Sequence, residues 1–139
     1  MKKFGSKSGF TLVELIVVIA ILGILAGIAV PTYSGYISKA REATDLTQLD
    51  AVKTAVDFAF IENSVKANKD TASLQSITVS QSGSNNATIT VSGTDSVTVS
   101  DTDINSYYNI SAFKFQSDNN KATWTAADGW KLEKVTTTP

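Results

Sequence analysis

The chain has 139 residues and a formal net charge of −1, and it contains neither cysteine nor histidine. Without cysteine it can form no disulfide and no thiolate metal site, and without histidine it lacks the commonest general base and metal ligand. We therefore expect a non-enzymatic protein with no catalytic residues, no cofactor and no metal. The charge also gives no electrostatic footprint for nucleic acid, and the length allows at most one folded domain beside a targeting segment.

The N-terminal segment begins with a basic leader, residues 1–9, which carries Lys2, Lys3 and Lys7. An apolar stretch follows over residues 10–30, and its part from residue 15 onward has no charged side chain. Such a stretch is about long enough to cross a hydrocarbon core of roughly 30 Å as a helix. The positive-inside rule then predicts a single-pass membrane segment with the leader in the cytoplasm and everything after Pro31 outside the cell.

A carboxylate, Glu14, lies inside this apolar stretch. On insertion scales a carboxylate in a spanning helix costs roughly 2.5–3.5 kcal/mol, so a partner for it is expected. A cleaved secretory signal, with Gly27 to Ala29 as its small-residue site, fits the glutamate poorly. A plain single-span anchor explains the length of the stretch but not the glutamate.

The residues that open the stretch, 9–15 (GFTLVEL), follow a short basic leader. In this arrangement they resemble the processing motif of class III signal peptides in type IV pilins and pseudopilins. The resemblance implies that a prepilin peptidase cuts between Gly9 and Phe10, that Phe10 is then N-methylated, and that the apolar segment stays on the mature chain. It extends to about residue 64 and is most specific at the motif.

In this reading Glu14 acts in subunit–subunit assembly. Cleavage creates a terminal ammonium on Phe10, and the Glu14 carboxylate of an incoming subunit can pair with that ammonium on a neighbour. At low dielectric such a pair is much stronger than in water, while an unpaired charge is penalised. Thr11 can add a hydrogen bond between subunits or cap the start of the helix, and capping is the favoured role.

One long helix is expected from residue 10 to about residue 63. Its first part, 10–35, is the hydrophobic transmembrane or filament-core helix, and its second part, 36–64, is amphipathic, with apolar residues at intervals of three and four. Pro31 lacks the amide proton that would bond the carbonyl of Gly27, so a kink or local melting is predicted there. Gly23 and Gly27 form a small-x-x-x-small pair that allows close helix approach.

The remainder, residues 65–139, is expected to form a β-rich globular head. Alternating apolar residues between turn-forming clusters predict five or six short antiparallel strands, including strands at Val97/Val99 and Phe113/Phe115. One face of the sheet would pack on the helix and a Ser/Thr-rich face would meet water. The predicted fold class is α+β, with a long N-terminal α-helix packed on a small antiparallel β-sheet.

Two acidic clusters in the head invite comparison with calcium sites, but solvated turn residues are the favoured interpretation of both. The clusters are Asp101, Thr102, Asp103 and Asn105, and Asp118, Asn119, Asn120 and Asp128. Many pilins close their last loop with a disulfide, which this chain cannot form. The resemblance therefore points to the cysteine-free pilins of Gram-positive or anaerobic bacteria, with the last loop held by hydrogen bonds and packing.

The function expected is that of a type IV pilus subunit, which starts as a membrane prepilin and becomes part of an extracellular helical homopolymer. The partners implied are the chain itself, a prepilin peptidase and N-methyltransferase, the membrane, and a pilus assembly platform with its ATPases. The first alternative is a pseudopilin of a type II secretion or DNA-uptake system. The second is a single-span, membrane-anchored binding module that forms no filament.

Overall fold

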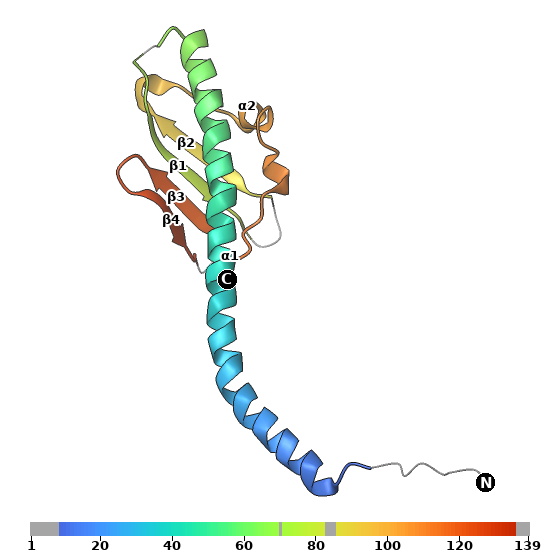
Figure 1. Cartoon of the computed structure of the whole chain (residues 1–139). Coiled ribbons are helices and arrows are strands. Elements are labelled where there is room, and N and C mark those ends of the chain that lie inside the picture. Colours follow the sequence, from blue (N-terminus) through green and yellow to red (C-terminus); the bar gives the residue numbers. More distant parts are fainter. Residues whose placement is uncertain (1–8, 70, 83–85, 136–139) are drawn as a thin grey trace, which may run out of the picture. The chain divides into compact units, whose positions relative to one another are not determined.

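The computed structural model describes residues 9–69, 71–82 and 86–135. The chain divides into two compact units, Met1–Ser38 and Lys39–Pro139. Helix α1, Leu12–Lys66, contributes to both units, and the strands and shorter helices all belong to the second, which we call the head unit (Figure 1). The basic residues of the expected leader lie outside the described residues.

The first unit, as far as it is described, consists of the start of α1 and the residues just before it. The helix begins at Leu12 rather than at Phe10, and Pro31 lies within it without interrupting the helical assignment. Two hydroxyls bond carbonyls near the proline: Thr32 Oγ1 donates to Ile28 O at 3.0 Å and Ser34 Oγ donates to Pro31 O at 2.9 Å. Loss of helicity around Gly27 and Pro31 stays a prediction.

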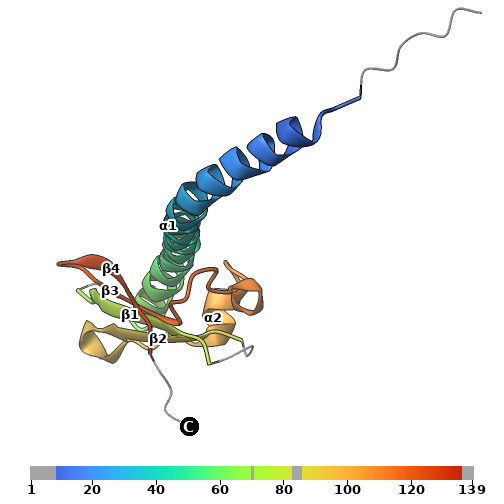
Figure 2. The ribbon, with the colours of Figure 1, turned by 90° about the horizontal axis from the view of Figure 1, so that it is seen from below.

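The head unit contains a four-stranded antiparallel sheet in the order β2-β1-β3-β4. Its strands are β1 (Leu74–Ser80), β2 (Thr88–Gly93), β3 (Lys121–Thr125) and β4 (Gly129–Glu133). Figure 2 shows β2 and β4 at opposite edges of the sheet, with α1 on one of its faces. The expected α+β class, a long N-terminal helix packed on a small antiparallel sheet, is confirmed.

The core of the head unit lies between the sheet and the part of α1 that belongs to this unit. Leu49, Val52 and Val56 are fully buried, as are Ile77 and Val79 of β1. These helix positions recur every three or four residues while the strand positions alternate, so each element turns one face inward. The predicted contact between the sheet and this side of the helix is confirmed.

Two tryptophans on neighbouring strands attach the β3–β4 side of the sheet to α1. Trp124 and Trp130 are paired across β3 and β4 and are half-buried. Lys53 Nζ lies 4.5 Å from the centre of the Trp124 ring, while Trp130 Nε1 donates to Asp50 Oδ1 at 3.1 Å. A cation–π contact thus joins Trp124 to α1, and a hydrogen bond joins Trp130 to it.

The outer face of the sheet carries hydroxyls in register across three strands. Thr78 of β1 lies opposite Thr90 of β2 and Thr123 of β3, and Ser76 lies opposite Ser92 and Thr125. The alternation of side chains along a strand places all of these residues on the face opposite Ile77 and Val79. The Ser/Thr-rich face expected from the sequence is therefore the solvent face of the sheet.

The segment between β2 and β3 differs from the prediction. The expected strands at Val97/Val99 and Phe113/Phe115 are not strands; the segment instead contains η1 (Thr94–Ser96), α2 (Asp101–Asn105) and η2 (Ile110–Ala112). Val97 and Phe113 are nevertheless buried. Their alternation with polar residues reflects burial from loops and short helices, and it does not reflect strand pairing.

Gly93 ends β2 where the strand passes close to the aromatic ring of Phe60. A Cβ atom built on Gly93 would lie 2.4 Å from Phe60 Cε2 and 3.2 Å from the carbonyl oxygen of Ser73. Only a residue without a side chain fits this approach between backbone and ring. The glycine therefore permits the close packing of β2 against the end of α1.

Candidate assembly surfaces

The start of α1 is closed by a reciprocal pair of hydrogen bonds between Thr11 and Glu14. The backbone N–H of Glu14 donates to Thr11 Oγ1 at 3.3 Å, and the backbone N–H of Thr11 donates to Glu14 Oε2 at 2.9 Å. Thr11 Oγ1 also donates to Glu14 Oε2 at 2.8 Å. This arrangement is a capping box, which satisfies amides that the first turn of a helix leaves without partners.

The capping role expected for Thr11 is thereby confirmed. Gly9 and Phe10 precede the helix in non-helical backbone, and the Phe10 side chain is 91% exposed. Both hydrogen bonds to the Glu14 carboxylate reach Oε2, and among the described residues none reaches Oε1. The carboxylate can therefore accept a further donor without giving up the cap.

The apolar part of α1 that follows has no protein around it within its own unit. Large aliphatic side chains from Leu12 to Val30 are all exposed, and α1 contains a segment that is long and apolar enough to cross a membrane. None of that segment is buried. An exposed apolar surface of this extent marks a membrane or protein interaction site.

In the head unit, the side of α1 that faces away from the sheet carries a row of exposed, uncharged residues. Eight exposed residues recur at alternating intervals of four and three: Ala40, Thr44, Thr47, Ala51, Thr54, Phe58, Ile61 and Val65. We call these residues the outward seam. The spacing is the heptad spacing of helices that pack against one another, and small residues allow close approach.

The hydroxyl groups of the three threonines in the outward seam are bonded within their own helix. Thr44, Thr47 and Thr54 each donate their hydroxyl to the backbone carbonyl four residues earlier, at 2.9–3.0 Å. With the hydroxyl bonded to its own helix, the methyl group is the part left to meet a partner. The seam therefore presents an apolar surface along the head-unit part of α1.

Two phenylalanines near the end of α1 point to different sides of the helix. Phe60 is buried in the core, whereas Phe58, on the outward seam, is 55% exposed. Its ring stacks on Tyr107, with the ring centres 5.6 Å apart. Together with Ala51 and Thr54, these two rings line a shallow hollow beside the outward seam.

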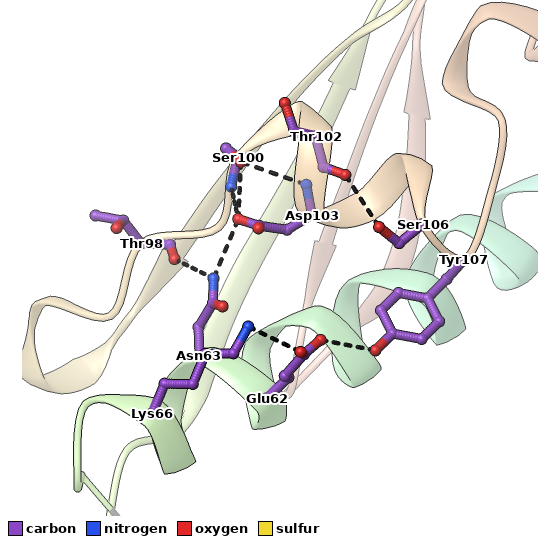
Figure 3. A network of polar contacts seen from close by, with 9 residues as sticks. All are labelled: Glu62, Asn63, Lys66, Thr98, Ser100, Thr102, Asp103, Ser106 and Tyr107. Carbon is purple, nitrogen blue, oxygen red and sulfur yellow. Dashed lines mark hydrogen bonds and ion pairs between the residues drawn. The ribbon is translucent and has the colours of Figure 1, made fainter.

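A polar network holds the segment around α2 against the end of α1 (Figure 3). Asn63 Nδ2 donates to the carbonyl of Thr98 at 2.8 Å and to Asp103 Oδ2 at 3.1 Å. Asp103 also forms a capping box with Ser100 at the start of α2. Glu62 accepts from Tyr107 Oη at 2.8 Å and pairs with Lys66 at 2.8 Å.

This network lowers the pKa values of its two carboxyls and raises those of the two groups that contact Glu62. The hydrogen bond from Lys66 to Glu62 lowers the pKa of the Glu62 carboxyl, and the backbone N–H of Ser100 lowers that of Asp103. The same contact with Glu62 raises the pKa of the Lys66 ammonium, and the hydrogen bond to Glu62 raises that of the Tyr107 hydroxyl.

Acidification should therefore loosen this segment before the head unfolds. A carboxyl with a lowered pKa stabilises the fold fully above its ordinary value, 4.5 for Glu62, and that contribution is lost as the pH falls through its folded value. We expect the aromatic resonances of Tyr107 to shift toward free tyrosine as the pH falls below the ordinary pKa of the Glu62 carboxyl. Lys66→Ala removes the hydrogen bond that lowers this pKa most, so it should move that change to higher pH, and an unchanged titration would contradict the role given to the network.

Several of the oxygens considered for calcium are engaged within the protein. Asp103 serves the capping box, and Asn105 Oδ1 accepts from the backbone N–H of Ile110 at 3.0 Å. Asn120 forms two hydrogen bonds with the backbone of Val135, at 2.7 and 2.9 Å. Within the described residues there is no group of three or more Asp, Glu, His or Cys side chains placed to hold a metal ion.

Sequence reasoning missed one residue that organises the head. Asp45 is fully buried on α1, and its carboxylate accepts from the backbone N–H groups of Gln116 and Ser117 at 2.6 and 3.0 Å. The Ser117 hydroxyl donates to it as well. The signal that could have found it is its spacing of four from Leu49, which places Asp45 on the core-facing side of the helix.

Comparison with known proteins locates a match at the N-terminus. Residues 5–30 match the family described as the prokaryotic N-terminal methylation motif. The chain is 54% identical over 57 residues to "Fimbrial protein Q" of Moraxella bovis and 42% identical over 57 residues to "Fimbrial protein" of Pseudomonas aeruginosa. In both cases the matched region covers 41% of this chain. These findings support the resemblance stated from residues 9–15.

The chain is also similar to a secretion-system protein. Over 70 residues, half of its length, the chain is 41% identical to "Type II secretion system core protein G" of Vibrio cholerae. The chain spans 36% of the length of the first of these relatives and 48% of the last. No solved structure matches the chain. The expected likeness to cysteine-free pilins of Gram-positive or anaerobic bacteria stays a prediction.

Proposed function

We propose that this chain is a structural subunit of a type IV pilus. It is inserted in the membrane as a prepilin, cleaved between Gly9 and Phe10, methylated at Phe10 and polymerised into a helical filament outside the cell. The observation that carries the proposal is the methylation-motif match at residues 5–30, on a helix whose apolar surface is uncovered in both units. An apolar surface of this extent is expected to associate with lipid or with other subunits, because its exposure to water is unfavourable.

The two surfaces suit the two environments of a pilus subunit. The segment from Leu12 to Val30 resides in lipid before assembly and packs against the same segment of other subunits afterwards. The outward seam of the head unit then packs against helices of neighbouring subunits. The hydroxyl face of the sheet is suited to remain in water.

The partners follow from this pathway and are part of the proposal. A prepilin peptidase cleaves after Gly9 and the N-methyltransferase modifies Phe10. An assembly platform and its ATPases supply the work of extracting subunits from the membrane. The leader, residues 1–9, is cytoplasmic in the precursor, and the segments 10–35, 36–64 and 65–139 become filament core, amphipathic helix and head.

Electron microscopy of filaments sheared from cells that express the chain, with mass analysis of the sheared protein, tests the proposal. We expect thin helical filaments composed of a chain that lacks residues 1–9 and carries one extra methyl group on Phe10. A mature chain that retains residues 1–9 and forms no filament would overturn the proposal in favour of a membrane-anchored binding module. Gly9→Leu, which blocks the cleavage site, should leave a precursor with the full mass.

A pseudopilin is the second candidate, because the similarity to the type II secretion protein covers half of this chain. A pseudopilin would share the cleavage and the helix packing but form only short filaments. Measuring protein secretion and surface filaments in cells that lack the chain distinguishes a pseudopilin from a pilus subunit. Loss of secretion without loss of surface filaments would favour the pseudopilin.

A charge on the outward seam should prevent assembly. In Ala51→Glu a carboxylate would enter the proposed helix–helix interface, where an unpaired charge costs several kcal/mol. We expect the yield of sheared filaments to fall about tenfold or more, since each 1.4 kcal/mol is a factor of ten in an equilibrium constant. Gln48→Glu, on the same helix but off the seam, should assemble normally, and equal yields from both variants would contradict the role of the seam.

A further inference from the structure

Strand β2 leaves one edge of the head sheet open. It occupies the end position in the order β2-β1-β3-β4, and within the described part of the chain it pairs only with β1. An edge strand presents a row of backbone N–H and C=O groups that can pair with another strand. Proteins usually protect such edges with charged side chains, proline or bulges.

The two edges of this sheet are protected to different degrees. At the opposite edge, β4 carries Lys131 and Glu133. The sequence of β2, TITVSG, contains neither a charged residue nor a proline. Its outward side chains, Thr88, Thr90 and Ser92, are exposed. The charged side chains of β4 thus disfavour pairing with a further strand at that edge, whereas nothing in the sequence of β2 does so.

The sequence of β2 is complementary to itself. In an antiparallel pair of two β2 strands with Thr90 opposite Thr90, Thr88 lies opposite Ser92 and Ile89 lies opposite Val91. Hydroxyl residues then face hydroxyl residues on the outer side, and β-branched aliphatic residues face each other on the inner side. No like charges are opposed, and the partly buried Val91 gains an apolar neighbour.

We propose that β2 pairs with β2 of a second copy of this chain, in antiparallel orientation and with Thr90 at the twofold axis. The pairing joins two four-stranded sheets into one continuous sheet and continues the hydroxyl rows across the junction. A second copy fits this edge better than another partner, because the strand's own pattern supplies both halves of the match.

This contact is separate from the one that would build a filament. A twofold contact uses the same surface on both molecules and closes on itself, whereas a helical filament needs head-to-tail contacts that propagate. Pairing through β2 would therefore join subunits of different filaments, or two unassembled subunits. It does not depend on the cleavage at Gly9 or on the outward seam.

Single cysteines test the register directly, because the chain has no cysteine of its own. Directly opposed residues in an antiparallel pair have Cβ atoms about 4.5–5.5 Å apart, within reach of a short bismaleimide. In the full-length chain in detergent micelles, Thr90→Cys should give a covalent dimer on the order of tenfold faster than Lys131→Cys at the other edge, because pairing raises the effective concentration. An equal rate for both variants would overturn the proposal.

The neighbouring positions fix the register. Thr88→Cys and Ser92→Cys should each dimerise slowly alone, because the identical residues would be about 13 Å apart, four residues along the strands. At the same total concentration, an equimolar mixture of the two variants should give the heterodimer about half as fast as Thr90→Cys gives its homodimer, because half of the pairs are mixed. Fast homodimers at both positions would show unspecific contact and overturn the proposed pairing.

A charge at the twofold axis supplies the independent check. In the mixture of Thr88→Cys and Ser92→Cys chains, adding Thr90→Lys to both should reduce the heterodimer rate on the order of tenfold, since two like charges would then be directly opposed. Adding Thr123→Lys, on the same outer face but in a central strand, should leave the rate unchanged. Cross-linking that survives Thr90→Lys would overturn the pairing even if the heterodimer forms.

Discussion

Replacing Glu14 by alanine is expected to abolish filament assembly while leaving cleavage after Gly9 largely intact. Cleavage creates an ammonium on Phe10, and without the carboxylate that charge enters the filament core unpaired. Breaking a buried ion pair by removing one partner costs about 3–5 kcal/mol. At each subunit contact this corresponds to more than about a hundredfold in the association constant.

The capping box shows how one carboxylate can serve two purposes. Thr11 N and Thr11 Oγ1 both donate to Glu14 Oε2, and Oε1 accepts no hydrogen bond from the described residues. Oε1 is therefore the oxygen that we expect to meet the ammonium of a neighbouring subunit. Thr11→Val removes the hydroxyl contacts but keeps the carboxylate, so its effect on assembly should be much smaller than that of Glu14→Ala.

The yield of sheared filaments measures assembly, and the mass of the membrane-bound chain measures cleavage in the same cells. Glu14→Gln keeps the shape of the side chain and should fail to assemble, because the charge is what compensates the ammonium. Glu42→Ala removes an exposed carboxylate elsewhere on α1 and should have no effect. Normal filaments from Glu14→Gln would show that the cap, and not the charge pair, is what assembly requires.

Helix α1 could be predicted because its pattern is long and regular. The apolar segment and the three-and-four spacing of Leu49, Val52 and Val56 predicted α1 to within a few residues at each end. This pattern repeats often enough to exclude the period of a strand. The alternations at Ile77/Val79 and Ile89/Val91 correctly predicted β1 and β2, although each contains only two apolar residues.

The segment from Thr94 to Asn120 could not be predicted in the same way. Two apolar residues separated by one polar residue fit a strand, but they also fit a loop that buries every second side chain. The deciding signals were local: the Ser100/Asp103 capping box begins α2, and the Asn109 side chain accepts from Ser111 N at the start of η2. Such short polar contacts outweigh a two-residue alternation.

The outward seam escaped sequence analysis because it lies beside the core-facing positions of the same helix. In the sequence, Ala40 and Ala43 continue the three-and-four spacing of Leu49 and Val52. The structure divides them: Leu49 and Val52 are buried, whereas the alanines are exposed. A helix with apolar residues on two sides shows the same three-and-four spacing on each, so the pattern alone cannot assign a side to the core.

Asp45 should be the polar side chain on which the stability of the head depends most. Its carboxylate receives two backbone N–H groups and one hydroxyl, all from residues 116–117, just before the chain enters β3. The Ser117 hydroxyl in turn accepts from Asn119 N at 3.2 Å. Without a disulfide, these bonds fasten the last third of the head to α1.

Asp45→Ala is expected to destabilise the head by about 3–5 kcal/mol, because two partly buried amide donors lose their acceptor at about 1–3 kcal/mol each and a small cavity remains at the buried Asp45 position. For a domain of this size each kcal/mol lowers the melting temperature by about 4–8 °C, so a loss of about 15 °C or more should follow. Asp45→Asn keeps one acceptor oxygen and should lose roughly half as much.

Thermal unfolding of the full-length chain in detergent, followed by near-ultraviolet circular dichroism of Trp124 and Trp130, measures this loss. Both tryptophans lie on strands that follow the fastened segment, so their signal reports on the part of the head that Asp45 secures. Asp50→Ala, on the same helix, removes an exposed carboxylate with one hydrogen bond and should cost about 1 kcal/mol. Equal melting temperatures for the two variants would mean that the apolar core alone, through Phe113 and its neighbours, holds residues 116–117 in place.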